Sequence, residues 1–238
     1  MAEPLLAIAG LRSGYRDVQV LWGLDLAVRQ GEIVALVGSN GAGKTTLLRT
    51  ISGQLTPNAG TIRFNGTEIG GRAPDTVLSA GIAHVPEGRR LFRGLTVRDN
   101  LLLGAYLRTD KAEVARDLDW VLDLFPILRD RQRQDATTLS GGEQQMCAIG
   151  RGIMSRPRLL MIDELSLGLA PRMVEHLGEA LLALNAKGQT ILLVEQDVLT
   201  ALELSNTAFV IENGRVARSG PSAELARDPS LSDAYLAI

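Results

Sequence analysis

Two hydrophobic patterns distinguish the strands that this sequence predicts. Continuous apolar runs occupy Ile33–Val37, Leu159–Ile162 and Ile191–Val194, which is typical of parallel strands covered by helices on both faces. Closer to the N-terminus, apolar residues alternate with polar or small ones, as in strands with one buried face. The alternating positions are Trp22, Leu24, Leu26 and Val28 in one segment, and Ile62 and Phe64 within Thr61–Asn65. We therefore expect an α/β fold with a mixed, largely parallel central sheet and a smaller antiparallel β subdomain.

Helical periodicity fills the chain between these strands. Apolar residues recur at helical spacing at Val174, Leu177, Leu181 and Leu184. This repeat predicts an amphipathic helix that ends near Gly188. Residues 96–154 contain no strand pattern, only helical stretches that are interrupted around Pro126 and before Ser140. The middle third of the chain is therefore expected to be a helical insertion into the α/β core.

The length and composition fit one folded domain with a sizeable core. The chain has 238 residues, of which 45% are hydrophobic and 22% are charged, so it resembles a folded protein rather than a disordered one. We expect residues 1–86 and 156–238 to form the α/β core, with the antiparallel subdomain near the N-terminus. Residues 87–155 would form the helical subdomain.

Charge, cysteine count and apolar run length exclude several classes of protein. The formal net charge is −2, which gives no overall attraction for nucleic acid, and the arginines within 89–93 and 129–133 are interpreted as solvated surface. The apolar runs are far shorter than the roughly 20 residues of a membrane-spanning helix. No basic run precedes an apolar segment near Glu3, as a secretory signal would require. With Cys147 as the one cysteine, neither an intrachain disulfide nor a Cys/His zinc site is expected.

A glycine-rich run follows the first buried strand and precedes a helical pattern with Leu47, Leu48 and Ile51. Its residues, which we call the phosphate loop, are Gly38, Ser39, Asn40, Gly41, Ala42, Gly43, Lys44, Thr45 and Thr46. The glycines allow backbone N–H groups to surround phosphate oxygens, and the helix N-terminus adds partial positive charge. Lys44, one of only three lysines among 25 basic residues, would reach the β- and γ-phosphates, and Thr45 would ligate Mg²⁺. The chain is therefore expected to bind a nucleoside triphosphate.

Two carboxylates follow the second buried strand. Mg²⁺ beside phosphates prefers oxygen ligands, and Asp163 and Glu164 come directly after Leu159–Ile162. We expect Asp163 to hold the metal through water, and Glu164 to orient or deprotonate the attacking water. An acidic pair can also be the solvated end of a strand, so this assignment depends on the phosphate loop.

A second candidate anion site lies in residues 139–145, Leu-Ser-Gly-Gly-Glu-Gln-Gln, which precede another helical pattern. A hydroxyl and bare backbone amides at the start of a helix can bind an anion. The alternative is an ordinary helix cap, in which Ser140 pairs with Glu143 as a capping box. A cap does not need two glycines, however, and the pair Gly141 and Gly142 is expected to leave backbone open to an approaching group.

These motifs, in this order and spacing, resemble the ATP-binding subunits of ABC transporters over essentially the whole chain. The resemblance implies a P-loop NTPase fold, with ATP and Mg²⁺ as cofactors, and two subunits that enclose two ATP molecules between them. The signature segment of one subunit, which here is Ser140, Gly141, Gly142 and Glu143, would contact the ATP held by the opposite subunit. Tyr15 would stack on adenine, although it also suits a local packing role. Ser166–Ala170 would cross the dimer interface, and Glu87–Leu95 would touch a membrane subunit.

The resemblance also implies partners and a location. Besides a second ATP-binding subunit, the expected partners are two integral membrane permease subunits and, indirectly, a solute-binding protein. No partner is a nucleic acid. The chain would be a peripheral protein on the cytoplasmic face of the inner membrane of the cell, so its own segments need not enter the bilayer.

Departures from the usual family pattern indicate a subgroup. Most of these ATPases have glutamine where Glu87 stands, histidine where Gln196 stands and proline where Leu165 stands. The first two departures, together with Ser-Leu-Gly-Leu-Ala-Pro at 166–171 and Ala-Tyr-Leu at 234–236, look like one of the two paired ATPases of branched-chain amino-acid importers. Related urea and amide importers share these features and remain an alternative.

Glu87 and Gln196 change the chemistry expected beside the γ-phosphate. A histidine could carry positive charge there, whereas Gln196 offers neutral amide groups. Glu87 could coordinate Mg²⁺ but would repel phosphate if left unpaired. Either this subunit hydrolyses ATP slowly and a different paired subunit completes the better site, or these residues suffice. We adopt the heterodimer as the working hypothesis, keep the homodimer as the alternative, and assign catalysis to Glu164, Gln196 and Lys44.

Other proteins with a phosphate loop explain the sequence less well. A small GTPase would carry the Asn-Lys pair that reads guanine, and the chain contains no such pair. Neither a GTPase nor a nucleotide kinase accounts for the signature segment. A DNA-repair ATPase of the ABC type needs a long coiled coil, and a related translation factor has two ATPase halves. A nucleotide-dependent regulatory module without a transport role remains open.

Overall fold

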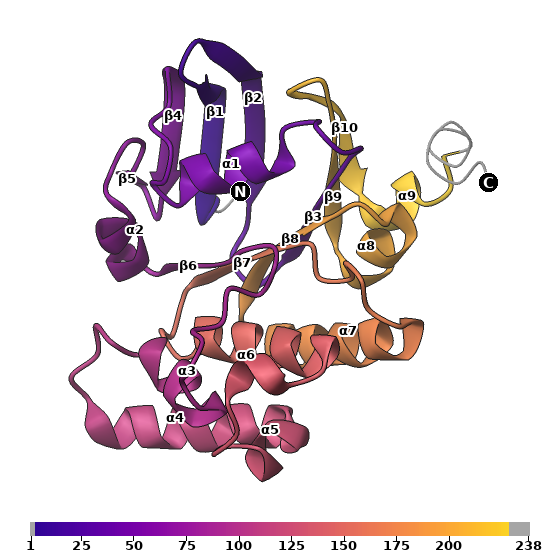
Figure 1. The fold of residues 1–238 in the computed structure, drawn as a ribbon. Helices are drawn as coiled ribbons and strands as arrows, with labels where there is room; N and C mark the ends of the chain where they lie inside the picture. Colours follow the sequence, from indigo (N-terminus) through magenta and orange to yellow (C-terminus); the bar gives the residue numbers. More distant parts are fainter. Residues whose placement is uncertain (1–2, 229–238) are drawn as a thin grey trace.

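A six-stranded, mostly parallel sheet forms the centre of the protein (Figure 1). The computed structural model describes residues 3–228, so the Ala-Tyr-Leu sequence at 234–236 lies outside the described residues. Along the sheet the strands are β10 (Arg215–Pro221), β9 (Thr207–Glu212), β3 (Ile33–Val37), β8 (Thr190–Glu195), β7 (Leu159–Asp163) and β6 (Ile82–Val85). Of these six, β10 alone is antiparallel to its neighbour. Every residue of β3, β7 and β8 is buried, which confirms the predicted α/β core.

A four-stranded antiparallel sheet lies beside the central one. Its order is β2 (Val18–Val28), β1 (Leu6–Tyr15), β4 (Ala59–Phe64) and β5 (Thr67–Glu68). Leu24, Leu26 and Val28 are buried as the alternation predicts, but Trp22 is 42% exposed. The pairing of β2 with β1 shifts register between Trp22 and Leu24, around Gly23, whose φ is 81°. Because such a bulge inverts the alternation of faces, the assignment of Trp22 to the buried face is wrong.

Alternate residues of the central strands contact two different layers. Leu160 and Ile162 of β7 share a core with α7 (Pro171–Ala186) and the helices of the middle segment. Leu159 and Met161 instead share a core with α1 (Lys44–Ile51) and the antiparallel sheet. Figure 1 shows these layers on opposite sides of the central sheet. A strand buried on both faces therefore needs a continuous apolar sequence, which is the pattern observed.

The helices of the α/β core cover the remaining surfaces of the central sheet. Besides α1 and α7 they are α2 (Pro74–Ala80), α8 (Val198–Leu204) and α9 (Ser222–Leu225). The predicted amphipathic helix is α7, since Leu177, Leu181 and Leu184 are buried. It ends at Ala186, two residues before Gly188.

Short helices make up most of residues 96–154. They are α3 (Val97–Leu103), α4 (Lys111–Leu124), α5 (Pro126–Asp130), the 3₁₀ helix η1 (Ala136–Thr138) and α6 (Gly141–Ile153). Phe125 alone separates α4 from α5, and Pro126 begins α5, because proline lacks an N–H group and suits the first turn of a helix. Within residues 3–228, no helix is both long enough and apolar enough to span a bilayer.

A buried asparagine holds the loop that leads into α3. Asn100 is fully buried, and its side-chain nitrogen donates hydrogen bonds to the carbonyl oxygens of Phe92, Leu95 and Thr96 at 3.1–3.2 Å. Its side-chain oxygen accepts a hydrogen bond from the Phe92 N–H group at 2.9 Å. The side chain thus gives the Phe92 N–H group an acceptor and adds a donor to three carbonyl oxygens of the loop.

Replacing Asn100 with alanine should lower the free energy of unfolding by about 1–3 kcal/mol, because the Phe92 N–H group loses its acceptor and three loop carbonyl oxygens lose a donor. Urea denaturation of the purified chain measures this change. Arg98→Ala, at an exposed position on the same helix, is the control and should shift stability by no more than about 0.5 kcal/mol. An Asn100→Ala variant as stable as this control would contradict the inferred role.

Candidate active site

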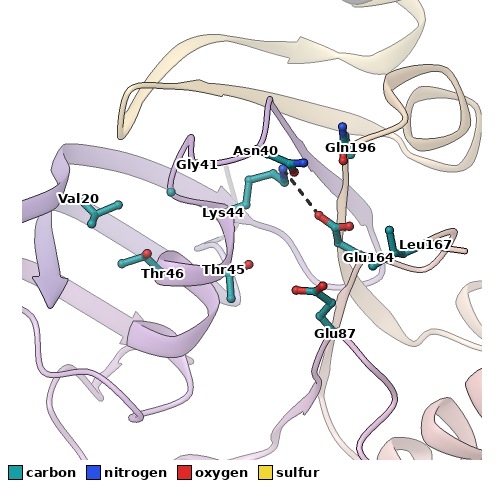
Figure 2. A pocket seen from close by; sticks show the side chains of 11 residues that line it. Val20, Asn40, Gly41, Lys44, Thr45, Thr46, Glu87, Glu164, Leu167 and Gln196 are labelled. Carbon is teal, nitrogen blue, oxygen red and sulfur yellow. Dashed lines mark ion pairs between the residues drawn. The ribbon is translucent and has the colours of Figure 1, made fainter.

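Four loops meet where β3, β8, β7 and β6 end. These strands are neighbours in the sheet, and parallel strands place the loops that follow them at one edge, where ligands of such sheets bind. A cavity of about 490 Å³ opens at this edge, and Figure 2 shows its side chains. It is lined by Val20, Asn40, Gly41, Gly43, Lys44, Thr45, Thr46, Glu87, Glu164, Leu167 and Gln196. Gly38, Ser39 and Ala42 belong to the phosphate loop but do not line the cavity.

The phosphate loop connects β3 to α1. Gly41 and Gly43 have φ angles of 81° and 112°, values that glycine adopts without steric strain. At Gly38, a Cβ atom would lie 2.4 Å from the carbonyl oxygen of Ile211, so a larger residue does not fit. Lys44 is buried, and its Nζ donates to the carbonyl oxygen of Gly38 at 2.7 Å. The loop therefore encloses an ammonium group and leads into a helix N-terminus, an arrangement suited to phosphate.

Asp163 is a buried carboxylate at the end of β7. It is 1% exposed, and burial raises its pKa from 3.8 to about 6, with smaller contributions from the charges of Glu164 and Glu87. A hydrogen bond with the Thr45 side chain and the charge of Lys44 act in the opposite direction on this pKa. Its Oδ1 atom is buried and has no hydrogen-bond partner. An unpaired ionised oxygen is costly in such a place unless a cation or donor reaches it.

These groups fit a magnesium ion that is bound together with nucleotide phosphates. Asp163 and Thr45 would supply oxygen ligands of the kind that Mg²⁺ prefers, and Glu87 lines the same cavity. Among residues 3–228, no three His, Cys, Asp or Glu side chains gather into a ready metal site. A few protein oxygens are nevertheless enough, because Mg²⁺ in nucleotide sites takes its other ligands from phosphates and water. The unpartnered Oδ1 of Asp163 is the atom that such an ion, or a water molecule bound to it, would satisfy.

Glu164 lies where the chain turns away from β7. Its φ angle is 54°, a left-handed value that is uncommon for a residue with a side chain, and its N–H group donates to the carbonyl oxygen of Val194 at 2.9 Å. One carboxylate oxygen lies 3.9 Å from Lys44 Nζ. In Figure 2 the side chain of Glu164 lies between those of Gln196 and Glu87. A carboxylate held in this position can accept a proton from a water molecule beside the phosphates.

The signature segment does not line this cavity. Ser140 caps α6, and its N–H group donates to Glu143 Oε2 at 2.9 Å, so the capping box considered as the alternative is present. A Cβ atom on Gly142 would lie 2.3 Å from Cγ of Met173. Gly142 thus packs directly against the Met173 side chain, and the expectation that both glycines leave backbone open is wrong for Gly142, which is buried. Ser140 itself is exposed.

Tyr15 lies at the end of β1, apart from the residues that line the cavity. The residue is 38% exposed, and its hydroxyl oxygen accepts a hydrogen bond from Arg49 Nη1 at 3.1 Å. The Arg49 guanidinium also lies 5.9 Å from the ring centroid. From the neighbouring strand it is Val20 that lines the cavity. Tyr15 thus has a local partner, and its stacking on adenine stays a prediction.

Comparison with known proteins decides the family. The family model described as "ABC transporter" matches residues 21–166, a stretch that contains the phosphate loop, the signature segment and both carboxylates. The chain belongs to the ABC transporter family. As the phosphate loop and carboxylate strand indicate, it is an ATPase and binds ATP.

Relatives of this ABC ATPase match it along nearly its full length. It is 45% identical to the high-affinity branched-chain amino acid transport ATP-binding protein BraG of Pseudomonas aeruginosa, over 98% of this chain and 99% of that protein. It is 40% identical to the probable branched-chain amino acid transport ATP-binding protein LivF of Archaeoglobus fulgidus, over 93% of this chain and 94% of that protein. A solved ATP-binding subunit of an ABC transporter is 33% identical, with a TM-score of 0.82 over 98% of this chain and 96% of that one.

Sequence reasoning missed one carboxylate at the edge of the site. Glu195 ends β8 and is 1% exposed, and burial raises its pKa. It accepts hydrogen bonds from Ser166 and Gln196. A signal was present, because a charged residue directly follows the apolar run Ile191–Val194. Leu165, the departure from the usual proline, directly precedes Ser166 and is fully buried, so its packing helps to hold the turn that follows β7.

Replacing Asp163 with asparagine should stabilise the ABC ATPase when nucleotide and metal are absent. Near neutral pH the carboxylate is ionised, above its pKa of about 6, and the amide removes a buried charge that Glu164 and Glu87 repel. A pKa raised on folding lowers stability above that pKa, and the cost disappears as pH falls toward the unfolded value. We expect the free energy of unfolding to rise by about 1–3 kcal/mol near pH 7.5, and by less near pH 5.

Urea denaturation at both pH values measures this change. The control is Asp17→Asn, which removes an exposed carboxylate from the turn between β1 and β2 and should leave stability nearly unchanged at either pH. A stabilisation by Asp163→Asn that does not depend on pH would rule out the removed charge as its cause.

Proposed function

We propose that this ABC ATPase powers the uptake of branched-chain amino acids. The observation that carries the proposal is its 45% identity with BraG over 98% of the chain. The relative LivF, at 40% identity, supports the same solute class. Glu87 and Gln196, the residues that resemble this subgroup of importers, both line the nucleotide cavity. ATP binding would close a pair of ATPase subunits, and hydrolysis would release them.

The charges in the cavity support a role for magnesium. Lys44 is the one basic residue among those that line it, whereas Glu87 and Glu164 are both acidic. The two carboxylates would repel the phosphates of ATP, and the buried Asp163 would add to this repulsion. We infer that Asp163 and Thr45 hold Mg²⁺, with Glu87 close to it, and that bound Mg²⁺ neutralises phosphate charge.

Each remaining side chain is assigned the step that its chemistry allows. Lys44 and the N–H groups of the phosphate loop bind the phosphates and stabilise charge that develops on the γ-phosphate. Glu164 accepts the proton of the attacking water. Gln196 orients that water or the γ-phosphate through its amide, without a charge of its own. Tyr15 stacks on the adenine, for which its partly exposed ring is available.

A second, different ATPase subunit is the proposed partner. Ser140 and the rest of the signature segment lie outside the lining of the chain's own cavity, which suits a contact with ATP on another subunit. In Pseudomonas aeruginosa two proteins named for branched-chain amino acid transport match this chain unequally, at 45% identity for BraG and 28% for BraF. The two members of that pair therefore differ in sequence, and this chain resembles one of them more closely.

A groove next to the signature helix is the proposed docking site for a permease. Its volume is about 260 Å³, and two aromatic residues on its edge, Phe92 and Tyr106, are 53% and 61% exposed. The groove is lined by Leu78, Ala83, His84, Val85, Phe92, Leu103, Gly104, Tyr106, Ala148, Arg151, Gly152 and Ser155. We propose that a short apolar segment of an integral permease binds here. Such binding would hold the chain against the membrane, and the face that we propose is the cytoplasmic one.

Arg151 connects this groove to the nucleotide cavity. From α6 its guanidinium donates to the carbonyl oxygens of Arg90 at 2.8 Å and Arg89 at 3.0 Å, and it lies 5.4 Å from the Phe92 ring centroid. The same segment begins with Glu87, which lines the nucleotide cavity. A permease segment in the groove would therefore contact a loop whose other end contacts ATP.

Glu164→Gln should lower ATP turnover by about 100-fold or more while ATP binding persists, because the amide cannot accept the proton of the attacking water. Lys44→Ala should instead weaken ATP binding by at least about tenfold, since the phosphates lose their one side-chain cation. Steady-state phosphate release and equilibrium binding of a fluorescent ATP analogue separate these effects. Glu179→Gln, an exposed carboxylate on α7, is the control. Unchanged turnover in Glu164→Gln would refute the catalytic assignment.

Tyr106→Glu should reduce the permease subunits that co-purify with the chain from solubilised membranes by at least about tenfold, because a buried unpaired charge weakens an apolar contact. ATP binding should not change, since Tyr106 does not line the nucleotide cavity. Leu182→Glu, at a position on α7 that is 46% exposed, is the matched control.

The co-purified proteins also test the proposed function. Two integral subunits and a second ATPase are expected, and reconstituted vesicles made from the complex should take up leucine with ATP. Uptake of urea or an amide instead would assign the related importers. A chain that never associates with membrane subunits would support a regulatory module.

A further inference from the structure

One buried carboxylate connects two loops that reach the nucleotide cavity. Glu195 Oε1 accepts a hydrogen bond from the Ser166 N–H group at 2.8 Å. Glu195 Oε2 accepts from the Ser166 hydroxyl at 2.9 Å and from the Gln196 N–H group at 3.2 Å. Both oxygens are therefore used, and the carboxylate bridges β8 to the loop that follows β7.

Groups that line the cavity flank both ends of this bridge. Ser166 follows Glu164 by two residues and precedes Leu167, and both neighbours line the cavity. Gln196, whose backbone the carboxylate holds, lines it as well. Glu164 is also attached to β8 through the bond from its N–H group to the Val194 carbonyl oxygen. Hence the turn containing Glu164 is fixed to β8 on both sides of that residue.

Burying a carboxylate at this position costs free energy, and the fold alone does not require one there. Glu195 is 1% exposed, and every other residue of β8 is buried too. Burial raises its pKa, with the charge of Glu164 among the contributions. An ionised group in this position stabilises the protein less than a well-packed apolar residue would. It does, however, accept hydrogen bonds from two separate loops at once, which an apolar residue cannot do.

We propose that Glu195 is a positioning residue for ATP hydrolysis. It holds Gln196 and the loop Ser166–Ala170, and thereby keeps the side chains of Glu164 and Gln196 in fixed positions relative to each other across the cavity. It touches no substrate atom in this role and acts through its two hydrogen-bonded neighbours. The proposal rests on the catalytic roles proposed above for Glu164 and Gln196. Because misplacing a reacting group by about 1 Å slows a reaction severely, loosening this bridge should affect the chemical step more than nucleotide binding.

The test uses the full chain with whatever subunits co-purify with it. Ser166→Ala removes one of the three hydrogen bonds and leaves the backbone donors in place. We expect kcat for ATP to fall about tenfold, with KM for ATP changed by less than about twofold. Ser166→Thr restores a hydroxyl and should return kcat to within about threefold of wild type. Thermal unfolding is measured for every variant, together with Ser205→Ala, which removes a comparable hydroxyl contact, to Ser222 at 2.7 Å, on the opposite end of α8.

Coupling between the two side chains is measured with Glu195→Gln and the double variant. If the bridge acts as a unit, Ser166→Ala combined with Glu195→Gln should lower kcat by no more than the more damaging single change. If the kcat of the double variant instead falls by the product of the two single fold-losses, the proposal is overturned. A Ser166→Ala variant with wild-type kcat would overturn it too. A loss of thermal stability larger than that of Ser205→Ala, with normal kcat for the folded fraction, would show a purely structural bridge.

Glu164→Gln in the same preparation distinguishes this proposal from the function on which it rests. Retained turnover in Glu164→Gln would refute the catalytic assignment itself. Lost turnover in Glu164→Gln, combined with full turnover in Ser166→Ala, would refute only the positioning role of Glu195.

Discussion

In the central sheet, β3 pairs with β8 and β8 with β7 in parallel, so that Val37 lies opposite Glu195 and Asp163 lies opposite Val194. These strands are buried on both faces, and backbone hydrogen bonds and side-chain packing therefore fix the same register. A slip by one residue would exchange the two faces of a strand, which pack against different layers. The phosphate loop, Glu164 and Gln196 consequently leave the sheet at one edge. This register sets the relative positions of all the site residues, so the whole site depends on it.

Two residues at the end of β7 are in energetically unfavourable states. Asp163 has an unpartnered buried oxygen and a raised pKa, and Glu164 has a left-handed backbone conformation. Such features stabilise neither the strand nor the turn, and they persist because the surrounding layers hold the backbone in place. The cost at Asp163 would fall when a cation binds beside its unpartnered oxygen. The buried residues of these strands thus stabilise the core, whereas the residues at the strand ends form the reactive site.

One helix extends from the signature segment to the proposed permease groove. At its N-terminus, Ser140 and Glu143 form a capping box, and Gly142 packs against Met173 on α7. Toward its C-terminus, Arg151 holds the segment that follows β6 through two carbonyl oxygens. Because these contacts belong to one α-helix, displacement of the segment would move the signature residues as well. In the proposed transporter, this helix would connect the permease contact with the ATP of the opposite subunit.

The chemistry of the site was readable from the sequence because its motifs are local. A phosphate loop needs glycines, a lysine and a hydroxyl at fixed spacing after a strand, and residues 38–46 meet this requirement without reference to distant parts of the chain. The three buried strands and α7 were equally predictable, since apolar periodicity directly reflects which faces are covered. The likeness of Glu87 and Gln196 to a subgroup of importers also came from the sequence.

The tertiary structure decided what depends on contacts between distant residues. The bulge around Gly23 exposes Trp22, although simple alternation places it inside. Met173 on another helix covers Gly142, a contact that the sequence could not predict. Glu195 and Ser166 are 29 positions apart in the sequence, and hydrophobic periodicity does not predict a contact between them. The hydrophobic pattern of a sequence shows which residues are buried. It does not show which group a buried polar side chain contacts, because the pairing of strands decides that contact.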